Sequence, residues 1–155
     1  MDDKHREIAE DLFSKVSMAL TEQGMAIPIF VLILPDDKVY PIIIQSEQEY
    51  DIQGYSSIVH DIAGQMNAKA IILVCEQFMV SKSQSDPGLK DLIDGKVRAS
   101  EHPDRKDYLT LMYLDEQNNC ESIISEIHKD PAGTKFTRDF KWISEAVTNI
   151  LVPWK

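Results

Sequence analysis

The side chains best suited to chemistry lie at the two ends of one long polar segment. Glu76 directly follows the apolar run 70–75. The other end of the segment carries a group of charged side chains: Glu101, His102, Asp104 and Arg105. Loops of this length without regular structure are uncommon inside compact domains and are usually functional or disordered. The five residues are therefore the candidate functional cluster of the chain.

Two interpretations of this cluster compete. A carboxylate at the end of a buried strand is costly to desolvate unless it is paired, and Arg binds carboxylates in a bidentate geometry. A Glu76–Arg105 ion pair joining the two ends of the loop is thus the structural interpretation. The functional one is a metal-assisted hydrolase, in which Glu76, His102 and Asp104 act as ligands or as a general acid–base pair. His102-Pro103-Asp104 also suits an ordinary turn, and without a His-Glu-x-x-His signature no metal or cofactor is predicted.

Other catalytic motifs are missing from the sequence. There is no Gly-x-Ser-x-Gly, and the glycines are scattered singly rather than gathered in a phosphate-binding loop. Cys75 and Cys120 lie far apart in strand-like runs and are expected to behave as small buried hydrophobes. His5 falls in the first turn of an expected helix and is predicted to be solvated. The chain therefore leans away from an enzyme.

Composition narrows the class of protein further. The 155 residues favour one domain, residues 1–155, and the formal charge is -10 with a pI near 4.7. No cluster of Lys and Arg suggests binding to nucleic acid. No apolar run is long enough to span a bilayer, and no export signal is visible, so a cytoplasmic protein is expected. The acidic charge favours solubility or a basic partner.

Hydrophobic periodicity predicts the first half of the fold. Apolar residues at three- and four-residue steps indicate a helix over 4–23, with Gly24 at its end. Two apolar runs, 27–34 and 39–44, flank a turn-rich segment and predict a β-hairpin. A second helix is expected over 48–66, followed by Asn67 in a left-handed conformation.

The second half reads mainly as strands. Runs at 70–75, 108–114, 121–128 and 135–140 predict four strands, with a long loop at about 77–106 and a final helix at about 141–151. The first of these strands is apolar on both faces and is expected to be central. The predicted fold is α+β, with an antiparallel sheet of about five to six strands, helices on one face, and the order α-β-β-α-β-β-β-β-α.

This order resembles the roadblock/longin-like and profilin-like groups of small α+β domains. A closer resemblance is to short uncharacterised bacterial proteins in which a strand ending in Ser-Glu-x-aromatic is followed by a loop closing on Pro-Ser-Glu-x-Pro-x-Arg. Here the matching segments are 74–80 and 100–105, with Cys75, Phe78 and Ala99 in place of Ser, Trp and Pro. The resemblance implies a bacterial source and no particular activity.

The leading functional prediction is a non-enzymatic cytoplasmic module that binds a protein or a small ligand and forms a homodimer. The alternatives are the metal-assisted hydrolase that uses Glu76, His102 and Asp104, and an acidic inhibitor or immunity protein that masks a basic partner. The charge of -10 is what suggests the last of these.

Overall fold

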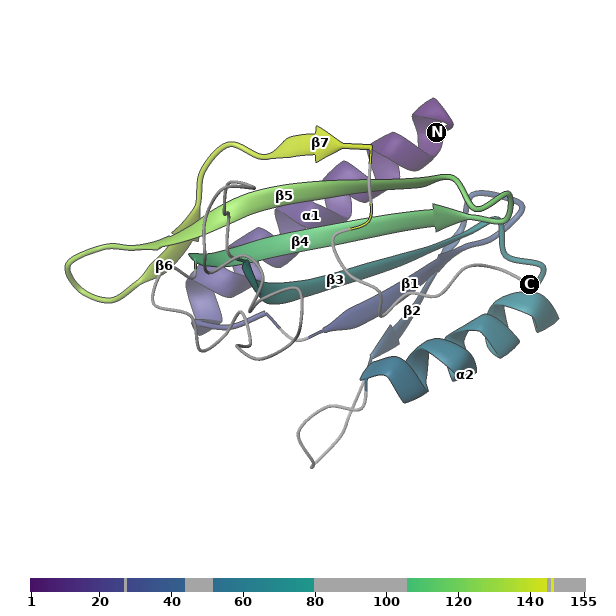
Figure 1. Ribbon diagram of the computed structural model, residues 1–155, viewed down its shortest axis with the longest axis horizontal. Coiled ribbons are helices and arrows are strands. Elements are labelled where there is room, and N and C mark those ends of the chain that lie inside the picture. The colour runs from purple at the N-terminus through teal and green to yellow at the C-terminus, as the bar shows by residue number, and fades with distance from the viewer. Residues whose placement is uncertain (27, 44–51, 80–105, 145, 147–155) are drawn as a thin grey trace, which may run out of the picture.

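The computed structural model describes residues 1–26, 28–43, 52–79, 106–144 and 146. This part of the chain forms two helices and an antiparallel sheet of seven strands, which confirms the predicted α+β class (Figure 1). The elements in chain order are α1 (Asp3–Gln23), β1 (Ile29–Ile33), β2 (Val39–Ile43), α2 (Ile52–Gln65), β3 (Ala70–Met79), β4 (Lys106–Asp115), β5 (Cys120–Lys129), β6 (Lys135–Thr137) and β7 (Lys141–Ile143).

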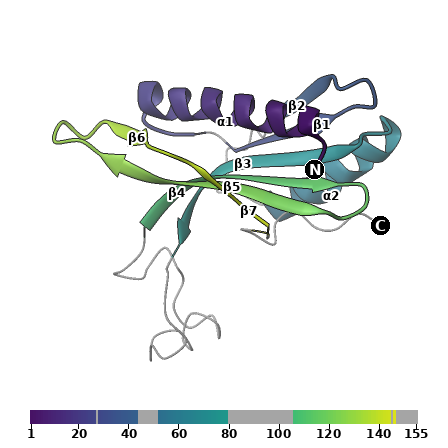
Figure 2. The same cartoon turned by 90° about the horizontal axis from the view of Figure 1, so that it is seen from above.

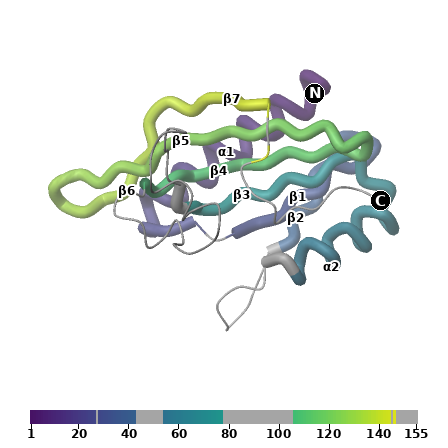
Figure 3. The backbone as a smooth tube through the Cα atoms, viewed as in Figure 1, coloured from purple at the N-terminus to yellow at the C-terminus, as the bar shows by residue number. Residues whose placement is uncertain are grey.

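The strands follow one another across the sheet in the order β2-β1-β3-β4-β5-β6, and β7 pairs with β5 (Figure 3). The predicted hairpin is confirmed as β1 and β2, with Val31 opposite Pro41. β3 lies between β1 and β4, so its predicted central position is confirmed as well. β6 and β7 pair with different halves of β5, and Ser125 between these halves donates its hydroxyl to the carbonyl oxygens of Arg138 and Asp139.

The helix boundaries follow from capping chemistry. The carboxylate of Asp2 accepts hydrogen bonds from the backbone N–H groups of Lys4 and His5, which begins α1. Gly24 ends α1 at φ +79°, a left-handed conformation that glycine adopts without steric cost. Asn67, at φ 55°, stands just beyond the end of α2 as predicted. Residues 44–51, where the second predicted helix begins, lie outside the described residues.

The two helices cover opposite faces of the sheet (Figure 2), so the prediction that they share one face is wrong. The reason lies in the alternation of β3. Ile72 and Val74 pack in the cluster under α1, whereas Ile71 and Leu73 pack in the cluster that contains the buried residues of α2. Successive side chains of a strand point to opposite faces, so a strand that is apolar throughout needs a covering layer on each side.

Two further expectations change. β3 continues to Met79 because its last residues pair with the start of β4, so residues 77–79 belong to the sheet rather than to the loop. The predicted helix at 141–151 is wrong at its start, because residues 141–143 form β7 against β5. Most of the predicted loop, residues 80–105, and residues 147–155 lie outside the described residues, and the single domain spanning 1–155 stays a prediction.

Candidate functional site

Glu76 is the one member of the predicted cluster that the structure describes. Its Oε1 accepts a hydrogen bond of 2.7 Å from the backbone N–H of Ala26, and its Oε2 lies 3.6 Å from Nζ of Lys135. The side chain is 26% exposed. Glu76 thus ties the segment after α1 to strand β6, which gives this carboxylate a structural role.

The other predicted site residues cannot be placed beside it. Glu101, His102, Asp104 and Arg105 lie outside the described residues, so the Glu76–Arg105 pair stays a prediction. Within the described part of the chain no group of three or more His, Cys, Asp or Glu side chains is arranged to hold a metal ion. No helix in that part is long and apolar enough to cross a membrane.

Cys75 is buried in β3, as its apolar surroundings in the sequence predict. Its Sγ lies 3.8 Å from the hydroxyl oxygen of Thr110, and the amide of Gln77 donates to the same hydroxyl oxygen. Burial raises the pKa of the Cys75 thiol above its ordinary value. A thiol that stays protonated is a poor nucleophile, and Cys75 therefore behaves as a core residue.

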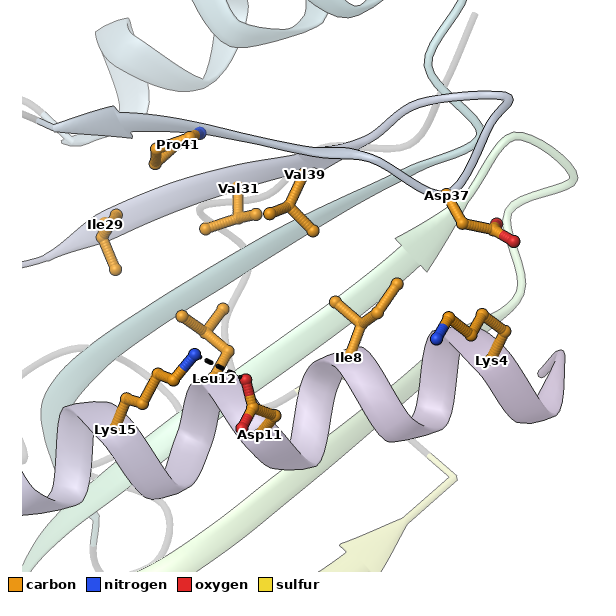
Figure 4. Close-up of a pocket in the computed structure, with 10 residues that line it drawn as sticks. All are labelled: Lys4, Ile8, Asp11, Leu12, Lys15, Ile29, Val31, Asp37, Val39 and Pro41. Atoms are coloured by element: carbon orange, nitrogen blue, oxygen red, sulfur yellow. Dashed lines mark ion pairs between the residues drawn. The ribbon is translucent and has the colours of Figure 1, made fainter.

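An open groove runs beside α1 (Figure 4). α1 packs over β3, β4 and β6, and Val31 and Ile33 of β1 are buried in the same cluster. The edge strand β2 has no helix above it on this face among the described residues. The space left between α1 and the hairpin measures about 390 Å³. We call it the α1–β2 groove.

Apolar side chains form the wall and the floor of the α1–β2 groove. Ile8 and Leu12, four residues apart and therefore on one side of α1, provide the wall. The floor comes from alternate residues of the hairpin, because Val31 lies opposite Pro41 and Val39 follows on the same face. Val39 is 51% exposed, although valine is among the residues most often fully buried.

Charged side chains stand at both ends of the groove. At the end nearer the middle of α1, Nζ of Lys15 lies 2.8 Å from the carboxylate of Asp11. At the other end, Lys4 in the first turn of α1 stands across from Asp37 in the β1–β2 turn. Any molecule in the groove would therefore meet an apolar centre between two charged ends.

Asp37 contacts His5, which in turn contacts Tyr113, and both of these side chains are buried. Its Oδ1 lies 3.5 Å from Nε2 of His5, and Nδ1 of His5 lies 2.7 Å from the hydroxyl of Tyr113. His5 is only 8% exposed, so the prediction that it is solvated is wrong: the first turn of α1 faces β4. Asp37 adopts φ 62°, a left-handed conformation that Asp tolerates better than most residues.

Tyr113 is the buried end of this chain of contacts. Burial raises the pKa of its hydroxyl, and the negative charges of Asp115, Asp2 and Glu121 raise it further. The phenol therefore stays protonated, and it donates its hydrogen to Nδ1 of His5 in the tautomer whose Nε2–H faces Asp37. The arrangement fixes His5, and through it the turn that carries Asp37.

A second, polar pocket of about 550 Å³ lies on the far side of Asp37. Its carboxylates already have partners. Asp2 caps α1, Asp115 accepts from the backbone of Gln117 and Asn119 in the β4–β5 turn, and Glu116 pairs with Lys69 at 3.2 Å. These contacts are helix-cap and turn chemistry, so the α1–β2 groove is the better candidate for a binding site.

β2 is an edge strand of the sheet that the described residues form, and its outer edge is poorly suited to accept another strand. Leu34 donates its N–H to the carbonyl oxygen of Lys38, and hydrogen-bonded pairs recur at every second residue of an antiparallel ladder. The backbone nitrogen of Pro41 therefore points away from β1, where proline offers no hydrogen to an incoming chain. Proline on an edge strand is a known defence against strand addition.

Comparisons of the chain with known protein families, with curated proteins and with solved structures find no match. The resemblance to roadblock/longin-like and profilin-like domains consequently stays a prediction, and the geometry of the groove is what points to function. The sequence did contain one signal for it: Val39 and Pro41 alternate on a strand whose proline marks an edge.

Proposed function

We propose that this protein is a non-enzymatic binding module that docks an amphipathic helix of a partner protein in the α1–β2 groove. The observation that carries the proposal is the exposed apolar floor formed by Val39 and Pro41 beside the helical wall of Ile8 and Leu12. Grooves of this kind bind helices through apolar residues spaced at three and four positions.

The dimensions of the groove suit one short helix. Neighbouring strands lie about 4.8 Å apart, so β2 stands two strand spacings, about 10 Å, from β3, which α1 covers. Packed helices lie about 8–10 Å apart, so a helix above β2 would stand at packing distance from α1. Among the described residues β2 is the strand left uncovered on this face, because Val31 and Ile33 of β1 are already buried in the cluster under α1. From Lys4 to Lys15, α1 rises by roughly 16 Å, which is about three helical turns. A docked helix of that length would complete the layer that α1 begins.

Other occupants fit less well. An added strand would meet Pro41 at the edge of β2, which has no N–H to donate. A second copy of the chain carries the same charge of -10, which opposes self-association and favours a partner of net basic charge. A second copy of the chain, as in the predicted homodimer, is therefore a less favourable occupant of the groove than a basic partner helix. The metal-assisted hydrolase gains no support from Glu76, because both carboxylate oxygens of this residue already face Ala26 and Lys135.

A displayed library of helical peptides of about 14 residues, patterned with apolar residues at helical spacing, tests the proposal. We expect the library to yield helices that bind the wild-type protein and lose at least tenfold in affinity for Val39→Glu. The matched control is Tyr40→Glu, because Tyr40 is similarly exposed (45%, against 51% for Val39) and lies on the opposite face of the same strand.

Three results would overturn the proposal. These are a library that yields no binder, selected sequences without a helical pattern, and equal weakening of binding by the two variants. Sedimentation equilibrium distinguishes the occupant of the groove: a wild-type dimer that Val39→Glu dissociates would place a second copy there instead of a partner helix. If the library yields no helix binder but a small apolar dye binds saturably at Val39, the occupant of the groove would be a small molecule rather than a partner helix.

A further inference from the structure

The charges at the two ends of the α1–β2 groove differ in how they are satisfied. Lys15 has Asp11 within 2.8 Å, and Lys4 has Glu7 within 3.9 Å. Asp37 has no Lys or Arg within 4.0 Å of its carboxylate among the described residues, and the imidazole of His5, at 3.5 Å, is the nearest group of a cationic type there. The side chain of Asp37 is 45% exposed at the mouth of the groove.

The direction of α1 adds a second constraint. The N-terminus of α1 lies at the end of the groove that contains Lys4 and Asp37. A helix carries partial positive charge at its N-terminus and partial negative charge at its C-terminus. A neighbouring helix therefore packs more favourably with its C-terminus beside the N-terminus of α1.

From these two observations, and resting on the proposed function, we infer that the partner helix runs antiparallel to α1 and presents a Lys or Arg of its last turn to Asp37. Basic residues are favoured in the last turn of a helix for the same electrostatic reason. A Lys or Arg at this position would therefore stabilise the partner helix itself and also pair with Asp37. The chain of Tyr113 and His5 behind Asp37 keeps its carboxylate at the mouth of the groove, and the acidic charge of the whole chain steers a basic helix towards it.

A double-mutant cycle tests the contact. The tightest library helix that ends in Lys is compared with the same peptide carrying Gln at that position, each against the wild-type protein and against Asp37→Asn. We expect the Lys-to-Gln change to weaken binding to the wild type about three- to fivefold, the range of an exposed ion pair, and to have no effect on Asp37→Asn. Asp36→Asn is the matched control, because Asp36 is the neighbouring carboxylate and does not line the groove.

The orientation has its own measurement. A nitroxide at the C-terminal end of the peptide should broaden the amide resonances of residues 36–38, and a nitroxide at the N-terminal end those of residues near Lys15. The reverse pattern, or the same Lys-to-Gln loss in Asp37→Asn, overturns the inference and leaves the proposed function standing, provided that Val39→Glu still weakens binding at least tenfold. A library with no helical binder would instead remove the proposed function itself.

Discussion

The two flanks of α1 are built in different ways. On one flank, residues 137–142 close against the helix: Thr137 hydrogen-bonds Ser17, the ring of Phe140 lies 5.6 Å from that of Phe13, and the indole N–H of Trp142 donates to Glu10. We call this the closed flank. The other is the open flank, where Ile8 and Leu12 face the α1–β2 groove.

The difference separates stability from binding. The closed flank uses directional polar contacts and aromatic packing, including the guanidinium of Arg6 at 4.8 Å from the ring centre of Trp142. The open flank has no comparable cover in the described structure and leaves Val39 exposed. Apolar surface that folding leaves uncovered beside a well-packed helix is typical of an interaction site. Substitutions on the two flanks should therefore have different consequences.

The largest loss of stability is expected for Phe13→Ala on the closed flank. Phe13 is buried against the sheet and contacts Phe140, so truncation leaves a cavity and should lower the free energy of unfolding by about 3–5 kcal/mol. Leu12→Ala on the open flank is the matched change and should cost about 1–2 kcal/mol, because part of this side chain already faces solvent. Denaturant unfolding of both variants measures the difference; equal losses would erase the distinction between the flanks.

Tyr113→Phe is expected to cost about 1–3 kcal/mol, since it leaves Nδ1 of the buried His5 without its hydroxyl partner. The pH dependence should change as well. Burial raises the pKa of Tyr113 in the folded state, so the unfolded chain loses this proton first, and wild-type stability should fall as the pH rises above about 10. The variant should lack this part of the alkaline loss. A variant as stable as the wild type, with an unchanged alkaline profile, would contradict the described role of Tyr113.

Trp142→Phe should have a smaller effect, about 0.5–1.5 kcal/mol, because the aromatic ring remains while the N–H that donates to Glu10 at 2.8 Å is lost. Thermal unfolding of Trp142→Phe, Glu10→Ala and the double variant isolates the coupling between the two residues. Strictly additive effects would mean that the closed flank does not depend on this hydrogen bond.

Val39→Glu should change stability least, by within about 0.5 kcal/mol, because the side chain is already half exposed and its replacement is solvated. Unchanged unfolding together with lost helix binding would sharpen the contrast with Phe13→Ala. A loss of stability as large as that of Phe13→Ala would show that Val39 belongs to the core and that the groove is not an independent surface.

The local elements of the fold could be predicted from the sequence, and their spatial relations could not. Helix α1 and the β1–β2 hairpin are marked by periodicity, by Gly24 and by turn residues, all of which act within a few positions. Strand β7 was predicted as a helix because Trp142 fits an apolar stripe, whereas pairing of this residue with Ile123 on β5 decides its conformation. Such long-range pairing leaves no local signal.

The binding site shows the same limit. Ile8 and Leu12 have the spacing of core residues, and nothing near them in the sequence reveals that the hairpin leaves a groove beside them. His5 was predicted to be solvated because the first turn of a helix is usually exposed, and its burial depends on Tyr113, more than a hundred residues later. The sequence marks Glu76 as a carboxylate that needs a partner, but the partners that the structure shows, Ala26 and Lys135, come from distant segments.

The central claim, that the open flank of α1 binds a helix, is tested most directly by mapping amide chemical shifts during titration with the tightest library helix. The predicted result is that the largest changes fall within residues 4–15 and 29–41, on α1 and on the β1–β2 hairpin that border the groove. Changes concentrated on α2, or on residues 137–142 of the closed flank, would contradict the account.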